Sequence, residues 1–154
     1  MINKIPSIML CLFIQCSSTK LYYDNTNYAR DELSKYSDFN CIFPEGKFTV
    51  FTTNSIESVD SDFPNSIVLQ IENLSKGQAK MVGNIGVGPV KVLKDSAGLT
   101  FIEIIPAGGY SFITIFGTKR KGENSFLAIF TKHNSTYIFP QSSQFFGSCA
   151  GLLK

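Results

Sequence analysis

Short apolar runs, separated by turn-forming residues, fill the chain from residue 41 onward. The runs are rich in Val, Ile, Phe, Thr and Tyr, and the segments between them contain Gly, Pro, Asn, Asp and Ser. Branched and aromatic side chains favour strands, whereas Gly, Pro and Asn favour turns, so this pattern is typical of consecutive β-strands. It predicts strands at residues 47–53, 66–72, 79–83, 90–94, 99–105, 110–116, 125–133 and 136–139.

Some of these strands are apolar on both faces. Residues 112–116 read Phe-Ile-Thr-Ile-Phe and residues 126–131 read Phe-Leu-Ala-Ile-Phe-Thr. Such strands lie in the centre of a packed sheet, lie under another element or face a partner. Most runs are shorter than the ~9–11 residues of a membrane-spanning strand. The fold class predicted is all-β: an antiparallel β-sandwich or a small closed β-barrel of about eight short strands.

The two-sided pattern also predicts where a partner would bind. We hypothesise that the domain binds through its loops or through an apolar face on these two strands, a face that contains some of six side chains. The set is Phe112, Ile113, Ile115, Phe126, Leu127 and Ile129. A filled interior would favour such an interaction face, whereas a hollow barrel would favour the alternative, a carrier of a small apolar ligand in the barrel cavity.

Composition and charge suit one folded domain. Hydrophobic residues make up 44% of the chain and charged residues 17%, which argues against disorder. The net charge of +2 and the short basic cluster 119–121, which lies in a predicted turn, give no basic stripe for nucleic acid. The predicted organisation is a β-rich domain at 41–154, preceded at 16–40 by a polar tether with a short helical or irregular element near 29–36.

The N-terminus carries a different pattern. Lys4 precedes an apolar run at 5–14, and a polar tract begins after Cys16. A basic start, an apolar stretch of ~7–15 residues and a polar break are typical of a secretory signal. The apolar run is too short for a membrane-spanning helix, which needs ~20 residues.

A cysteine at that break resembles the processing site of bacterial lipoproteins. The resemblance lies in Leu12-Phe13-Ile14-Gln15-Cys16 followed by Ser17. The family usually has leucine three positions before the cysteine and a small residue directly before it, where this chain has Phe13 and Gln15. The resemblance implies a signal peptide at 1–15, a lipid on Cys16 and a membrane anchor at the cell envelope. Two alternatives stay open: a secretory signal cut near Ser17 or Ser18, giving a secreted soluble protein, and a buried N-terminal element of a cytosolic protein.

The remaining cysteines indicate a disulfide. Cys11 would leave with the signal peptide, and Cys16 would carry the lipid, which leaves Cys41 and Cys149. An exported protein matures in an oxidising compartment, so we predict that these two form a disulfide. Free thiols or a metal site are the alternatives, although two isolated cysteines and one histidine lack metal-ligand spacing.

Motifs for chemistry are weak. The glycine-rich stretch 83–89 lacks the spacing and the following helix of a dinucleotide site, and we interpret it as a tight connection between strands. His133 is the only histidine and lies in a predicted turn. The acids of 57–62 do not match a calcium loop. Glu103 is a single charge in an apolar strand, at a solvent-exposed edge or at a site.

The function predicted from these observations is non-catalytic. We expect an exported, lipid-anchored protein of the cell envelope that acts as a binding or interaction module for a protein partner. No enzyme activity, cofactor, metal or nucleic-acid partner is expected.

Overall fold

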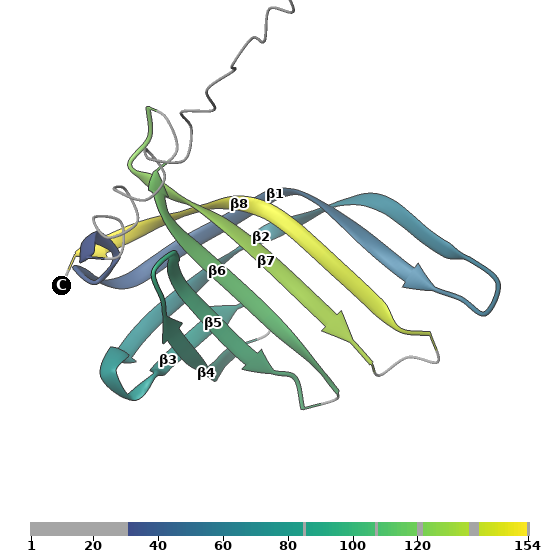
Figure 1. Ribbon diagram of the computed structural model, residues 1–154, viewed down its shortest axis with the longest axis horizontal. Helices are drawn as coiled ribbons and strands as arrows, with labels where there is room; N and C mark the ends of the chain where they lie inside the picture. Colours follow the sequence, from purple (N-terminus) through teal and green to yellow (C-terminus); the bar gives the residue numbers. More distant parts are fainter. Residues whose placement is uncertain (1–30, 85, 107, 120–121, 136–138, 154) are drawn as a thin grey trace, which may run out of the picture.

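The computed structural model, which describes residues 31–84, 86–106, 108–119, 122–135 and 139–153, is a closed barrel of eight antiparallel strands (Figure 1). Each strand pairs with the next along the chain, and the last pairs with the first. The predicted all-β class is confirmed, and a barrel forms instead of a sandwich. The elements are β1 (Tyr36–Phe51), β2 (Ile56–Asn73), the 3-10 turn η1 (Leu74–Lys76), β3 (Gln78–Gly83), β4 (Gly86–Lys94), β5 (Gly98–Ile104), β6 (Gly109–Lys119), β7 (Ser125–Asn134) and β8 (Gln141–Leu153).

The N-terminal segment lies mostly outside this description. The predicted signal peptide, the lipidation site at Cys16 and the tether up to residue 30 are not among the described residues. Of the short helical element expected at 29–36, the described part contains one helical turn at 31–33. In the described ranges, no helix is both long and apolar enough to cross a membrane.

The first strand begins earlier than the sequence pattern predicts. β1 starts at Tyr36, before the predicted domain boundary at residue 41 and before the predicted strand at 47–53. Register shifts between Ile42 and Glu45 on the β8 side, and around Phe43 on the β2 side, mark β-bulges next to Pro44. Proline lacks the N–H that a ladder needs and is confined to edges and bulges. The bulges interrupt the alternation of side chains, which hides the first half of the strand from a pattern search.

The last strand was not predicted. Residues 141–153 form β8, which pairs with β7 and β1 and closes the barrel. The sequence predicts a strand at 136–139 instead, of which 136–138 lie outside the described residues. Ser and Gln at 141–144 have little intrinsic preference for strands. Pairing on both sides therefore fixes this segment as a strand, and its own residues do not.

Alternation along each strand builds the core. Side chains of one parity point inward and pack against each other, as the period of two in a strand requires. The buried apolar residues form one cluster: Leu33, Tyr36, Phe39, Cys41, Phe43, Ile67, Leu69, Ala79, Val90, Val92, Leu99, Phe101, Ile113, Ile115, Phe126, Ala128, Phe130, Phe145 and Cys149. An eight-stranded barrel is just wide enough to be filled by such side chains.

The disulfide predicted between Cys41 and Cys149 is present in this core. The two cysteines face each other as register partners on β1 and β8, and their Cα atoms are 4.0 Å apart. Both side chains are fully buried. The bond therefore ties the first strand to the last, across the seam where the barrel closes.

One end of the barrel is plugged. Leu33 of the helical turn is buried, and the ring of Tyr36 packs edge-on against Phe126 at 5.6 Å between centroids. The Tyr36 ring also covers Gly151, where an added Cβ would lie 2.5 Å from it. Figure 1 shows the helical turn at this end, beside the end of β8. In a meander the connections alternate between ends, so the β1–β2, β3–β4, β5–β6 and β7–β8 connections all lie at the opposite, open end.

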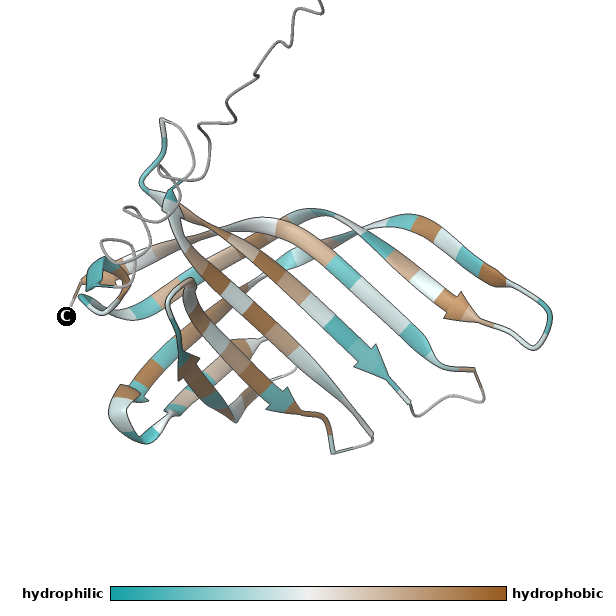
Figure 2. Cartoon of the chain, viewed as in Figure 1, coloured by the Kyte–Doolittle hydropathy of each residue, from teal (hydrophilic) through white to brown (hydrophobic). Residues whose placement is uncertain are grey.

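The predicted apolar binding face is divided by the barrel wall. Ile113, Ile115 and Phe126 point inward and are buried in the core. They therefore cannot contact a partner, and only the other three members of the set remain available to such a face. Phe112, Leu127 and Ile129 have the opposite parity and lie on the outer wall. Figure 2 shows that apolar residues recur along β6 and β7, the two strands whose faces looked alike in sequence.

Candidate functional site

The interior changes from apolar to polar towards the open end. Glu103, Ser111, Lys132 and Ser143 are successive register partners on β5, β6, β7 and β8, and form a polar row around the inner wall. The next row inward, at positions 101, 113, 130 and 145, contains only Phe and Ile. Because paired residues of neighbouring strands point to the same face, the sheet register brings these polar groups together above an aromatic layer.

A cavity of ≈ 220 Å³ opens at this level, and we call it the mouth pocket. Its lining residues come from β2, β3, β4, β5, β7 and the β3–β4 turn: Phe63, Ile67, Met81, Gly83, Asn84, Gly86, Val87, Gly88, Glu103, Phe130 and Lys132. The volume equals that of about seven water molecules at ~30 Å³ each. It is below the ~300–1,000 Å³ of pockets for drug-sized ligands, so it suits a small molecule or one end of a longer one.

Aromatic rings form the floor of the mouth pocket. The rings of Phe63 and Phe130 meet edge-to-face at 5.3 Å between centroids. Phe145 packs against both, at 5.9 Å from Phe63 and 5.7 Å from Phe130, and Phe43 lies 5.5 Å from Phe130. Rings locked by several neighbours lose little further entropy when a ligand binds, and such pairs add ~0.5–1.5 kcal/mol beyond their buried area. The floor is therefore rigid and apolar.

Glycines form one wall of the mouth pocket. Gly83 and Gly86 pair at the end of the β3–β4 hairpin, and Gly88 follows on β4. Gly86 has φ 133°, a conformation that favours glycine. This agrees with the interpretation of the stretch 83–89 as a tight connection between strands. No heavy atom lies within 4 Å of a Cβ built at any of the three, so the missing side chains leave space at the mouth.

Pro89 ends the pairing between β4 and β5 beside the mouth pocket. The ladder between β4 and β5 covers only the pairs from Lys91↔Ile102 to Lys94↔Leu99. Pro89, the next residue of β4 with the same parity as Lys91, has no N–H to donate to a partner on β5. The two strands are therefore unpaired between the Lys91↔Ile102 pair and the open end of the barrel. In this unpaired part, Gly88 and Glu103 border the pocket.

Two opposite charges lie in the mouth pocket. Ser111, which is only 2% exposed, donates a hydrogen bond from its Oγ to Oε2 of Glu103 at 2.7 Å. Lys132 lies on the other side of Ser111 in the polar row. Among the described residues, neither Glu103 nor Lys132 takes part in an ion pair. Glu103, which the sequence left open between an exposed edge and a site, thus lines a pocket.

Sequence reasoning missed the other members of this site. Lys132 and Ser111 share the inward parity of Phe130 and Ile113, and Glu103 shares that of Phe101. A polar residue two positions away from a core residue on the same strand points to the same side of the sheet, and this pattern could have identified them. Nothing in the sequence marked Phe63 or Met81 as pocket residues. The β1–β2 register shifts on both sides of the Phe43↔Phe63 pair, so alternation does not predict which way Phe63 points. Met81 lines the pocket only because the sheet closes into a barrel.

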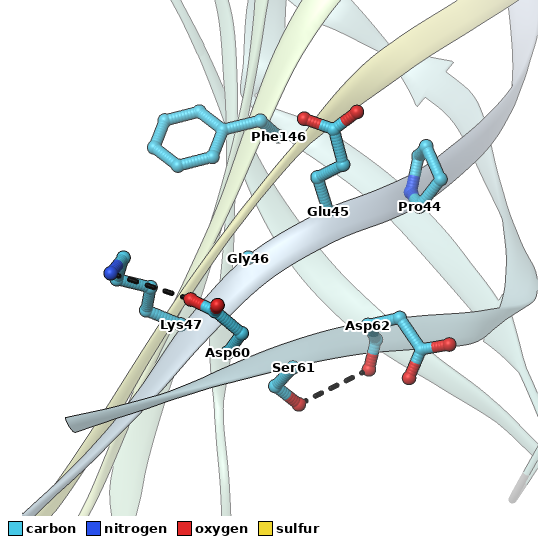
Figure 3. Close-up of a pocket in the computed structure, with 8 residues that line it drawn as sticks. All are labelled: Pro44, Glu45, Gly46, Lys47, Asp60, Ser61, Asp62 and Phe146. Atoms are coloured by element: carbon cyan, nitrogen blue, oxygen red, sulfur yellow. Dashed lines mark hydrogen bonds and ion pairs between the residues drawn. The ribbon is translucent and has the colours of Figure 1, made fainter.

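A larger hollow of ≈ 640 Å³ lies on the outer wall beside the β1 bulge (Figure 3). Its side chains include Glu45, Lys47, Asp60, Asp62 and Phe146. Lys47 and Asp60 form an ion pair at 3.4 Å, with side chains 67% and 92% exposed. Figure 3 shows the carboxylates of Asp60 and Asp62 turned in different directions. In the described ranges, no group of His, Cys, Asp and Glu is arranged to hold a metal ion.

His133 lies on the outer wall, near the rim of the open end. Its ring is 6.1 Å from that of Phe112. The hollow beside it, ≈ 440 Å³, is lined by Phe51, Gly109, Tyr110, His133, Asn134, Ser135, Pro140, Gln141 and Ser142. A serine nucleophile needs a base within reach that is itself oriented by a third group, usually a carboxylate. The described residues of this lining include serines but no carboxylate.

No protein-family model, curated protein or solved structure matches this chain. The function is therefore inferred from the barrel and its mouth pocket.

Proposed function

We propose that this protein is a non-catalytic binding protein whose barrel holds a small molecule with an apolar body in the mouth pocket. The observation that carries the proposal is the ≈ 220 Å³ cavity, with an aromatic floor and a side-chain-free glycine wall at the open end of the barrel. Below this level the interior is filled by packed side chains. The ligand would therefore sit at the mouth, and not deep inside as in a hollow carrier barrel.

Apolar contact sets the expected affinity. A ligand that buries ~200 Å² of apolar surface on Phe63, Ile67 and Phe130 gains ~5 kcal/mol at ~25 cal/mol per Å². Loss of translational and rotational freedom offsets part of that gain. Because that loss costs ~4 kcal/mol or more, the net free energy is well below the gross gain. Purely apolar fragments should bind weakly and to one site.

A filling variant tests this proposal. Gly88→Leu adds a side chain where the structure has open space, so it should occupy the pocket without disturbing the fold. Lys91→Leu is the matched control, because it adds the same side chain on the outside of β4. Ligand-observed NMR with toluene and cyclohexane should show binding to the wild type and to Lys91→Leu. Gly88→Leu should lose it. Equal binding to all three proteins, or none to the wild type, would reject the mouth pocket.

We propose in addition that the protein is exported and anchored by a lipid on Cys16. The leader with its loose lipoprotein pattern supports this, and so does a Cys41–Cys149 disulfide, which suits an oxidising compartment. Several acyl chains on one cysteine would hold the protein permanently, since each buried methylene contributes ~0.8 kcal/mol. Mass spectrometry of the mature N-terminal fragment should find an acylated Cys16, and Cys16→Ala should release the protein from membranes. An unmodified N-terminus at Ser17 or beyond would remove the anchor.

A second candidate function is contact with a protein partner through the outer wall. Three large apolar side chains on adjoining strands favour it: Ile42 is 53% exposed, Leu127 40% and Phe146 46%. Leu127 and Ile42 flank Ser148 in one row of the sheet, and Phe146 lies in the next row on β8. A photo-crosslinker at position 146, in intact cells, should trap one discrete partner. The same probe at Gln70, on the outer face of β2, should not. Equal adducts at both positions would contradict this function.

A further inference from the structure

The ionisable groups of the mouth pocket restrict its ligand more than its shape does. Among the described residues that line it, Glu103 and Lys132 are the only ionisable ones, and they have opposite charge. They lie on β5 and β7, with Ser111 of β6 between them in the same row. Two strand spacings of ~4.8 Å separate their backbones by about 10 Å. That backbone separation is of the size that a small molecule spans.

Each charge has capacity left for a ligand. Oε2 of Glu103 accepts the Ser111 hydroxyl, which orients the carboxylate, and no hydrogen bond to Oε1 is made within the described residues. The Lys132 ammonium can donate three hydrogen bonds, and in the same residues it donates none to a side chain. Both groups are half-buried above the aromatic floor, where charge–charge interactions are stronger than in water.

We infer that the mouth pocket binds a compact zwitterion with an apolar body, in the size class of an apolar α-amino acid. This rests on the function proposed above and names its ligand. The ligand's ammonium group faces Glu103, its carboxylate faces Lys132, and its apolar side chain lies on Phe63 and Phe130. A simple anion would gain Lys132 but meet repulsion from Glu103, and a simple cation would meet the reverse. Only a ligand with both charges can pair with both Glu103 and Lys132.

Three probes with one apolar body separate the charges. L-Phenylalanine carries both charged groups, phenethylamine only the ammonium, and 3-phenylpropanoate only the carboxylate. Because the zwitterion makes one more hydrogen bond to a charged group than either single-charge probe, it should bind at least about tenfold more tightly. Isothermal titration or NMR titration at low salt measures the three dissociation constants.

Two charge-removing variants assign the ends of the ligand. Lys132→Met should weaken phenylalanine binding about tenfold and leave phenethylamine unchanged or tighter. Glu103→Gln keeps an acceptor for Ser111, and should weaken phenylalanine about tenfold while 3-phenylpropanoate binds unchanged or tighter. The controls are Glu72→Gln and Lys80→Met, which remove the same charges from an exposed ion pair on the outer wall. Thermal unfolding of each variant shows that the fold is retained.

The outcomes separate this inference from the proposed function. If all three probes bind equally to the wild type and Gly88→Leu abolishes them, the apolar pocket stands and the zwitterion is rejected. If no probe binds, and toluene and cyclohexane also fail to bind the wild type, the pocket itself is rejected. A zwitterion preference that survives both charge variants would place the ligand elsewhere and overturn the inference.

Discussion

Replacing Cys41 and Cys149 by alanine tests whether the strand seam depends on its covalent bond. The disulfide closes a loop with a sequence separation of 108 residues. In the chain-entropy model, a loop of that length removes about 4.7 kcal/mol of unfolded-state freedom. Loss of two fully buried sulfurs weakens packing in the same direction. We therefore expect Cys41→Ala/Cys149→Ala to lose ~4–5 kcal/mol of unfolding free energy, with a fall in Tm of roughly 15–20 °C.

Equilibrium urea unfolding, followed by far-UV circular dichroism, measures this loss. The slope m should rise, because an unfolded chain without the cross-link is less compact and exposes more surface. The single variant Cys41→Ala should match the double variant closely, since either one breaks the same bond. Ile113→Val is the control: it removes one buried methylene, costs ~0.5–1.5 kcal/mol and should leave m unchanged. A loss below ~1 kcal/mol with an unchanged m would show that the β1–β8 ladder alone secures the seam.

Three further predictions concern the barrel wall and its core. Leu69→Ala, at a fully buried site, should cost ~2–5 kcal/mol in urea unfolding. Gly147→Ala should destabilise measurably in the same assay, because its Cβ would collide with the Ile42 carbonyl oxygen, whereas Gly83→Ala, with open space, should stay within ~0.5 kcal/mol. Pro89→Val restores an N–H and should extend the β4–β5 ladder. Slower hydrogen exchange on β5, measured by NMR, would show this, and unchanged exchange would contradict the role assigned to proline.

Several strands could be predicted from the sequence because the β-propensity of their residues and the alternation of buried and exposed positions agreed. Residues 66–72, 99–105 and 110–116 were predicted as strands and lie within or largely overlap β2, β5 and β6. In each, branched or aromatic residues alternate in phase with the core. The first halves of β1 and β2 and all of β8 were missed. In those segments bulges, proline and small polar residues hide the alternation, and pairing with distant strands supplies the stabilisation.

For the mouth pocket, too, the sequence showed some of the residues but not how they come together. The glycine-rich stretch and Glu103 were noticed in the sequence, yet nothing local placed them in one cavity. Lys132, Ser111 and Phe63 come from other strands, and only the register around the barrel brings them to the open end.

By itself, the sequence determined an antiparallel all-β domain, because period-two alternation and turn residues are local properties. It predicted the Cys41–Cys149 disulfide only together with a leader that removes Cys11 and uses Cys16, and the tertiary structure pairs the two cysteines. The sequence also presents a leader that predicts export. The tertiary structure alone decided that the sheet closes into a barrel, which of the apolar faces of β6 and β7 points inward, and that Glu103 and Lys132 share a pocket. Closure depends on pairing between β1 and β8, far apart in the chain, so no short window of residues contains it.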